Sequence, residues 1–223
     1  HYTDASALLS IFEKKELWLT DLLYMNDSME LKNGIEQFFN IDSVNSEQGE
    51  SFDEASYMRD MVALAAPEMN NFKHEYKNKE IQGFSEILEK KRLSIFSISF
   101  CQKNNLLSQW RGYTNETIGY AIEFDHKGLY ELLSKKVDKT YGIYECVYKP
   151  EEQARVVNQI RNSLRMNETT YFYDKVFFPL SSLKHVDFEE ENEVRLMIAE
   201  HEKIEFRAKN GVICPFIKLG IPD

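Results

Sequence analysis

Two glutamates late in the chain have a spacing that suits acid–base or charge-stabilising chemistry. They are Glu191 and Glu193 in the stretch FEEENEVRL, residues 188–196. Residues i and i+2 of a strand point to the same side, so a strand that extends back to Glu191 would place both carboxylates together. One carboxylate could then stabilise positive charge or grip a hydroxyl, while the other acts on an acceptor. Arg195 would share that face, where it could balance the charges or hold a phosphate.

A simpler interpretation of the same residues is an exposed strand edge with solvated charges and a loose ion pair. Only the first interpretation needs the carboxylates in a cleft. In both, strand alternation divides the residues between two faces. One face takes Glu193, Arg195 and Met197, and the other takes Val194, Leu196 and Ile198.

A second polar face is predicted at the start of the sequence, where His1 and Thr3 stand at strand spacing. Trp18 and Thr20 repeat this spacing within LWLT, residues 17–20, which we also expect to be a strand. Taken alone, His1 is more simply an exposed or hydrogen-bonded histidine, or the remnant of a tag.

A third polar patch follows the strand predicted for LSIFSISFC, residues 93–101. Ser97 and Ser99 share one face of that strand, and the polar connection after it contains QWRGY, residues 109–113, in a predicted short helix. Trp110 and Tyr113 offer aromatic planes on which a ring could stack, although each could equally pack in the core.

The elements that position these patches form an α+β pattern, with helices concentrated early and strands late. Asp4 or Thr3 is expected to cap a first helix, and Asn210-Gly211 is expected to turn a closing hairpin. Further helices are expected from the loop at 26–28 to about 39, over most of 53–92, and over 127–136, 151–165 and 168–178; further strands are expected over 117–124, 141–148, 193–199, 204–208 and 212–219.

Composition restricts the function classes. The chain has 223 residues and a formal charge of −10, so bulk attraction to nucleic acid or anionic lipid is not expected. No apolar run approaches the roughly 18 residues of a membrane span. Three cysteines without a CxxC spacing predict reduced thiols in a cytoplasm. The missing initiator methionine predicts a start that lies upstream or was trimmed, and hence a single, slightly clipped domain over 1–223.

Common catalytic motifs are missing from the sequence, which contains no HExxH, GxGxxG, P-loop or GxSxG. The histidines show no recognisable zinc spacing, so no metal is expected. A metal-dependent hydrolase built around His185, Glu191 and His201 is retained as a rival hypothesis.

The three patches together resemble a bacterial family. The blocks HYT…LWLT…NDS.E, SFC…QWRGY…IGYAIEF and K…E.EVRL are similar, in that order, to the domain of unknown function 2971 family. More distantly, they resemble the ADP-ribosyltransferase fold of the His-Tyr-Glu type. That resemblance implies a split mixed or antiparallel sheet core, with an inserted helical region around residues 28–92.

The resemblance also implies roles at a site that consumes NAD as its substrate. His1 would bond a ribose hydroxyl, Glu193 would bind the nicotinamide ribose, and Glu191 would orient the acceptor. The remaining cofactor-binding positions would be Thr3 supporting the first strand, Thr20 and Ser99 on neighbouring strands, Tyr113 or Trp110 stacking on nicotinamide, and Arg111 or Arg195 meeting the pyrophosphate.

The leading hypothesis is therefore an enzyme that cleaves the nicotinamide–ribose bond of NAD and transfers ADP-ribose to a macromolecule. By family analogy it would be a bacterial toxin or phage-defence effector, with an antitoxin or other regulatory protein as a further partner. Water as acceptor would make it an NAD glycohydrolase. The rival is a non-catalytic domain that senses a nucleotide or binds a protein. We expect Glu193→Gln to abolish turnover and leave folding intact.

Overall fold

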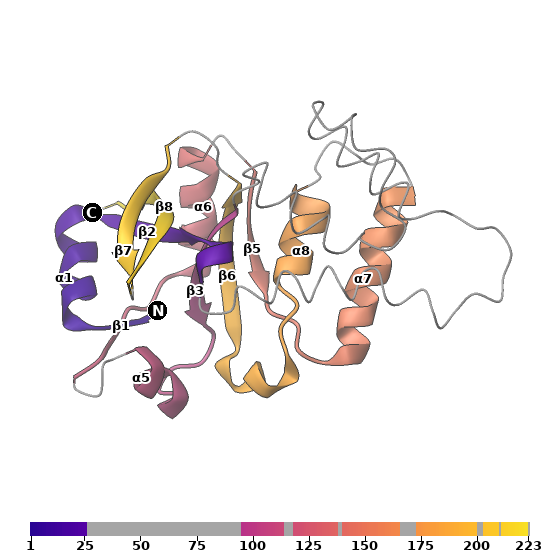
Figure 1. Ribbon diagram of the computed structural model, residues 1–223, viewed down its shortest axis with the longest axis horizontal. Coiled ribbons are helices and arrows are strands. Elements are labelled where there is room, and N and C mark those ends of the chain that lie inside the picture. The colour runs from indigo at the N-terminus through magenta and orange to yellow at the C-terminus, as the bar shows by residue number, and fades with distance from the viewer. Residues whose placement is uncertain are drawn as a thin grey trace, which may run out of the picture.

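A computed structural model describes residues 1–25, 95–113, 118–137, 140–165, 173–199, 203–209 and 211–222 (Figure 1). Within these ranges the architecture is α+β with antiparallel sheets, which confirms the fold class at this level. The helices expected between residues 28 and 92 lie outside the described residues.

The larger sheet has the strand order β5-β6-β3-β2-β8-β7, and every neighbouring pair is antiparallel. β6 lies between β5 and β3, so the interpretation of this strand as an exposed edge is wrong. The strands are β2 (Glu16–Asp21), β3 (Ile95–Cys101), β5 (Tyr141–Glu145), β6 (Glu193–Ala199), β7 (Glu205–Lys209) and β8 (Val212–Gly220).

A short ribbon pairs β1 (Tyr2–Thr3) with β4 (Tyr120–Ala121). The predicted strand over 117–124 is therefore only two residues long in its described part. After β1, the side chain of Asp4 accepts a hydrogen bond from the Ala7 amide and caps α1 (Ala5–Lys14), as expected of an N-cap aspartate. At the other end of the chain, Gly211 supplies the positive φ of 78° that the β7–β8 hairpin requires.

One face of the larger sheet is apolar and packs against α6 (His126–Lys136). Alternate residues of β2, β3, β6 and β8 meet two leucines of the helix on this face, because successive strand residues point to opposite sides. The buried cluster consists of Leu17, Leu19, Phe96, Ile98, Leu129, Leu133, Leu196, Ile198, Ile217 and Leu219. The predicted faces of β3 and β6 are thus confirmed.

The remaining helices lie around the sheet. α1 is at one side, and α7 (Pro150–Arg165) and α8 (Phe178–Ser181) are at the other, beyond β5 (Figure 1). The predicted helix over 168–178 is described only from Tyr173, as one turn that leads into α8. α5 (Leu107–Tyr113) is the short helix expected after β3. Among the described residues, none of these helices has the length and apolar character needed to cross a membrane.

Candidate functional site

A cleft of about 710 Å³ opens on the polar face of the sheet, within the size range of small-molecule sites. β1, β2, β3, β6 and β7 all contribute to it, together with α1. Seven residues with a predicted catalytic or ligand-binding role line this cleft: His1, Thr3, Thr20, Ser99, Tyr113, Glu191 and Glu193.

Glu193, the first residue of β6, is the buried centre of an ionic network. Its Oε1 accepts hydrogen bonds from Ser99 Oγ at 2.5 Å and from Arg195 Nε at 2.7 Å. Its Oε2 accepts from Lys184 Nζ at 2.7 Å and from Arg195 Nη2 at 3.1 Å. A carboxylate has about four acceptor positions, so protein donors satisfy all of them.

The network fixes the ionisation of Glu193. Burial by itself would raise the pKa of this carboxyl, but the charges of Arg195 and Lys184, with their hydrogen bonds, outweigh burial and lower the pKa to about 2. Glu193 is therefore a carboxylate at neutral pH. Its charge is balanced by the two buried cations that contact it, Lys184 and Arg195.

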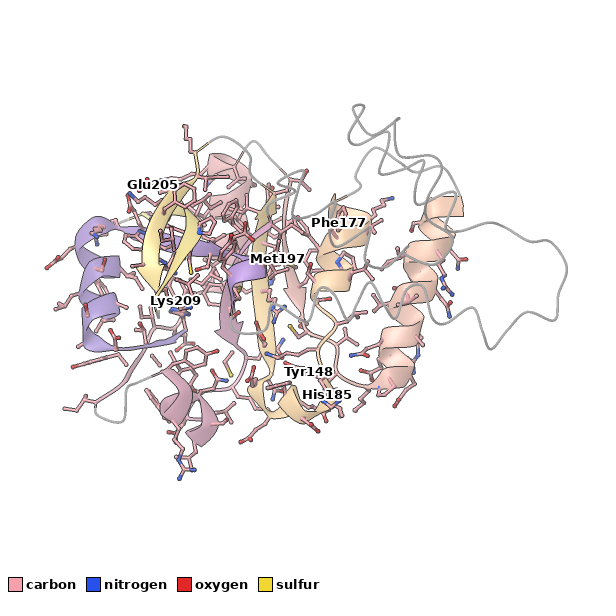
Figure 2. All side chains as sticks on the ribbon, in the orientation of Figure 1. Tyr148, Phe177, His185, Met197, Glu205 and Lys209 are labelled. Atoms are coloured by element: carbon pink, nitrogen blue, oxygen red, sulfur yellow. The ribbon has the colours of Figure 1, made fainter. Side chains whose placement is uncertain are left out.

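Backbone contacts hold the network in place from the α7–α8 side of the sheet. The Glu193 amide donates to the Tyr148 hydroxyl at 2.8 Å, and Arg195 Nη1 donates to the Ser181 carbonyl at 2.7 Å. Gln153 of α7 donates to the Lys184 carbonyl at 2.7 Å. The segments that carry Tyr148 and His185 run side by side through the bridge between Val147 and Leu183 (Figure 2).

Glu191 joins the same ionic network, but from a 3₁₀ turn and not from the strand that was predicted. It ends a 3₁₀ turn, Val186–Glu191, and Asn192 follows with a left-handed φ of 42°, so β6 does not extend back to Glu191. Glu191 Oε2 nevertheless accepts from Lys184 Nζ at 2.6 Å. Lys184 thus joins the two glutamates, and the side chain of Glu191, at 24% exposure, is the more accessible of them.

Ser99 connects Glu193 to His1. Its hydroxyl bonds Glu193, and its backbone carbonyl lies 2.9 Å from His1 Nδ1. Because a carbonyl oxygen only accepts, Nδ1 carries a proton, and in the neutral form of the ring Nε2 is then the acceptor. Thr3 is buried in β1 beside this pair.

Of the tyrosine, tryptophan and arginine residues predicted to contact the ligand, only Tyr113 lines the cleft. Tyr113 lines the cleft, whereas Trp110 does not: its ring packs edge-on against Tyr2 with centroids 4.6 Å apart. Arg111 is exposed on α5 and is not among the cleft residues. Arg195 is buried and bonded to Glu193, so it supports the carboxylate and does not line the cleft.

Two contributions could not be recognised from the sequence. Lys184 stands in the K…E.EVRL block, but its spacing gives no indication that one ammonium reaches two glutamates. Arg207 of β7 lines the cleft and donates through Nη2 to Thr20 Oγ1 at 2.6 Å. No motif marks this arginine, because β8 lies between β7 and β2 and the contact depends on that strand order.

The metal rival has little support in the described residues, where no three histidine, cysteine or carboxylate side chains are grouped to hold an ion. His185 lies 3.2 Å from Asp187 and is well exposed, and His201 lies outside the described residues. All three cysteines are free.

Comparison with known proteins adds one finding. A family model described as "Protein of unknown function (DUF2971)" matches residues 109–196. This segment runs from the start of QWRGY to Leu196 of β6, so it contains Lys184, Glu191, Glu193 and Arg195. The match supports the family resemblance over that part of the chain. No curated protein and no solved structure matches the chain.

Proposed function

We propose that this cleft binds NAD and cleaves its nicotinamide–ribose bond, with transfer of the ADP-ribosyl group to a macromolecular acceptor. The observation that carries the proposal is the contact of Ser99 with both Glu193 and His1. It brings an ionised carboxylate and an imidazole within reach of one small ligand.

The chemistry assigns each group a task. The bond between ribose C1′ and the nicotinamide nitrogen breaks, and its electron pair leaves with nicotinamide. The sugar then carries oxocarbenium-like positive charge, which the Glu193 carboxylate stabilises. A nucleophilic oxygen or nitrogen of the acceptor forms the new bond at C1′, and Glu191 takes the proton that the acceptor loses. His1 Nε2 accepts a hydrogen bond from a ribose hydroxyl and orients the sugar.

The Ser99 hydroxyl is the donor that we expect a substrate hydroxyl to displace from Glu193. All acceptor positions of this carboxylate are filled by protein donors, so a ribose hydroxyl must displace one of them. The Ser99 hydroxyl is the neutral donor of the set and rotates freely about one bond, whereas Arg195 and Lys184 are charged and buried.

Because protein donors fill every acceptor position of Glu193, a second candidate function is a non-catalytic domain that senses a nucleotide. In that case the network only holds the cleft open, and the ligand bonds to His1, Thr20 and Tyr113 without approaching Glu193. The two candidates predict the same binding of NAD but differ in nicotinamide release.

The test is nicotinamide release from NAD by the wild type, with and without RNA, DNA or lysate protein. Glu193→Asp is the informative variant, because it keeps the charge that Arg195 and Lys184 need while it withdraws the carboxylate by one methylene. A displacement of about 1 Å can cost about 100-fold in rate. We expect that loss, with a melting temperature near that of the wild type.

Glu189→Asp is the matched control, since Glu189 is exposed on the 3₁₀ turn that precedes β6, where its side chain lies 3.8 Å from Lys149. It should release nicotinamide at the wild-type rate. If NAD raises the melting temperature but no condition releases nicotinamide, the sensing domain becomes the better explanation. If NAD neither binds nor reacts, both candidates fail.

A further inference from the structure

Two cations on β7 face the cleft without an assigned task. Arg207 and Lys209 stand at i and i+2 of this edge strand, so their side chains leave it on the same side, and both line the cleft. Lys209 is the last residue of β7 and Glu205 is the first, so the two lie at different ends of the strand (Figure 2). Glu205 is already paired with Lys218 at 2.7 Å.

In the described part of the chain, neither Arg207 nor Lys209 has a carboxylate partner. Their charges therefore face the cleft uncompensated, although carboxylates are present there. The four acidic residues of the cleft lining are engaged elsewhere: Asp4 caps α1, Glu16 accepts from Trp18 Nε1, and Glu191 and Glu193 bond Lys184.

The guanidinium of Arg207 is held in a fixed place. Nη2 donates to Thr20 Oγ1 at 2.6 Å, and the guanidinium carbon lies 5.4 Å from the ring centroids of both Trp18 and Phe216. Both rings are within the distance of a cation–π interaction. Nε is buried and has no hydrogen-bond partner among the described residues, so the guanidinium keeps an unused donor in an oriented position.

Desolvation and mutual repulsion make these cations receptive to an anion. Burial lowers the pKa of Arg207, and burial followed by the charge of Arg207 lowers the pKa of Lys209. A bound anion would relieve both effects. An arginine fork with an adjacent ammonium is suited to phosphate oxygens.

We infer that Arg207 and Lys209 form an anion subsite that holds the diphosphate of a nucleotide ligand in the cleft. Thr20, which Arg207 bonds, is paired with Ser97 of β3, and Ser99 of that strand bonds Glu193. The contact of Arg207 with Thr20 reaches across β8, and from there β2 and β3 lead to Glu193 on β6, so the two cations and the buried carboxylate lie at opposite ends of one row of contacts. A dinucleotide would place its diphosphate at the first end and its reacting ribose at the second. The inference rests on the proposed function in taking the ligand as a dinucleotide.

The test is calorimetric titration of the full chain with ADP-ribose and with inorganic pyrophosphate. We expect both to bind the wild type, and Arg207→Gln and Lys209→Gln each to weaken ADP-ribose by about tenfold or more, since charge-assisted bonds are lost. Arg207→Lys should retain part of the affinity. Arg155→Gln and Lys127→Gln remove exposed charges from α7 and α6 and should bind like the wild type. Melting temperatures identify any variant that fails to fold.

The outcomes separate this inference from the proposed function. If ADP-ribose binds through Arg207 and Lys209 but NAD is never cleaved, the subsite stands and the enzyme proposal fails. If NAD is cleaved and both Gln variants keep the wild-type KM, the enzyme proposal stands and the subsite is overturned. Failure of the wild type to bind either anion also overturns the subsite.

Discussion

The two faces of the central strands differ in how their side chains are stabilised, one by apolar packing and the other by an ionic network. On β6, Leu196 and Ile198 point into the apolar layer under α6, while Glu193 and Arg195 point into the buried ionic network beside the cleft. Both sets are almost completely removed from water. One strand therefore stabilises the fold through Leu196 and Ile198 and carries the candidate chemistry on its other face, through Glu193 and Arg195.

The difference teaches how the fold supports a buried charge. Apolar burial is favourable by itself, whereas a charge taken out of water must be compensated by partners of the opposite sign. Glu193 is compensated by Arg195 and Lys184, and Lys184 is shared with Glu191. The apolar face should consequently tolerate small losses of volume, and the polar face should respond to any loss of charge.

The largest effect is expected for Glu193→Gln. This variant leaves Arg195 and Lys184 buried with less negative charge, and breaking a buried pair costs about 3–5 kcal/mol. On the basis of these buried pairs, we now expect the variant to be less stable than the wild type, whereas the sequence alone predicted intact folding. Urea denaturation at pH 7 measures the loss. A stability within about 0.5 kcal/mol of the wild type would show that the network contributes nothing to folding.

The same variant has a pH signature. Because the pKa of Glu193 is lowered to about 2, its stabilising contribution is complete above the unfolded value of 4.5 and is lost as pH falls toward 2. In that range the unfolded chain binds the extra proton. The difference between wild type and Glu193→Gln should therefore shrink between pH 4.5 and pH 2. A difference that stays constant would contradict the lowered pKa.

The next effect concerns the apolar face. Leu196→Ala removes a fully buried side chain from the cluster under α6 and should cost about 2–5 kcal/mol. Its deficit should stay constant between pH 4.5 and pH 2, the range in which the deficit of the Glu193 variant shrinks. Equal pH dependence of the Leu196 and Glu193 variants would remove the distinction between the two faces. A negligible cost would contradict the facing of β6.

The alternation of polar and apolar residues was enough to predict these faces. FSISF in β3 and EVRLMIA in β6 each show the period of two, and the cap at Asp4 and the turn at Gly211 are local signals. The grouping of His1, Ser99 and Glu193 was predicted only through the family resemblance. Their proximity depends on strand order, which links residues about a hundred positions apart.

The remaining features depend on contacts that no local pattern encodes. Arg195 belongs to the polar face, as predicted, but its burial against Ser181 follows from the packing of α8 on that side of the sheet. Glu191 reaches Lys184 from a 3₁₀ turn, which the strand pattern does not indicate. The pairing of β4 with β1 consists of two residue pairs, Tyr2 with Ala121 and Thr3 with Tyr120, which the longer apolar pattern of the sequence does not indicate.

The smallest effect is expected for two serines that share the polar face of β3. The Ser99 hydroxyl donates a hydrogen bond to Glu193, so Ser99→Ala should cost about 1.5–3 kcal/mol, as expected for a bond to a charged group. Ser97 is also buried, but its hydroxyl has no hydrogen-bond partner, so Ser97→Ala removes an unsatisfied group and should be neutral or slightly stabilising. The two urea midpoints provide a matched comparison within one strand. Since a ribose hydroxyl is proposed to take the place of the Ser99 hydroxyl, Ser99→Ala should also bind NAD at least as tightly as the wild type, and a large loss of affinity would mean that Ser99 itself holds the ligand.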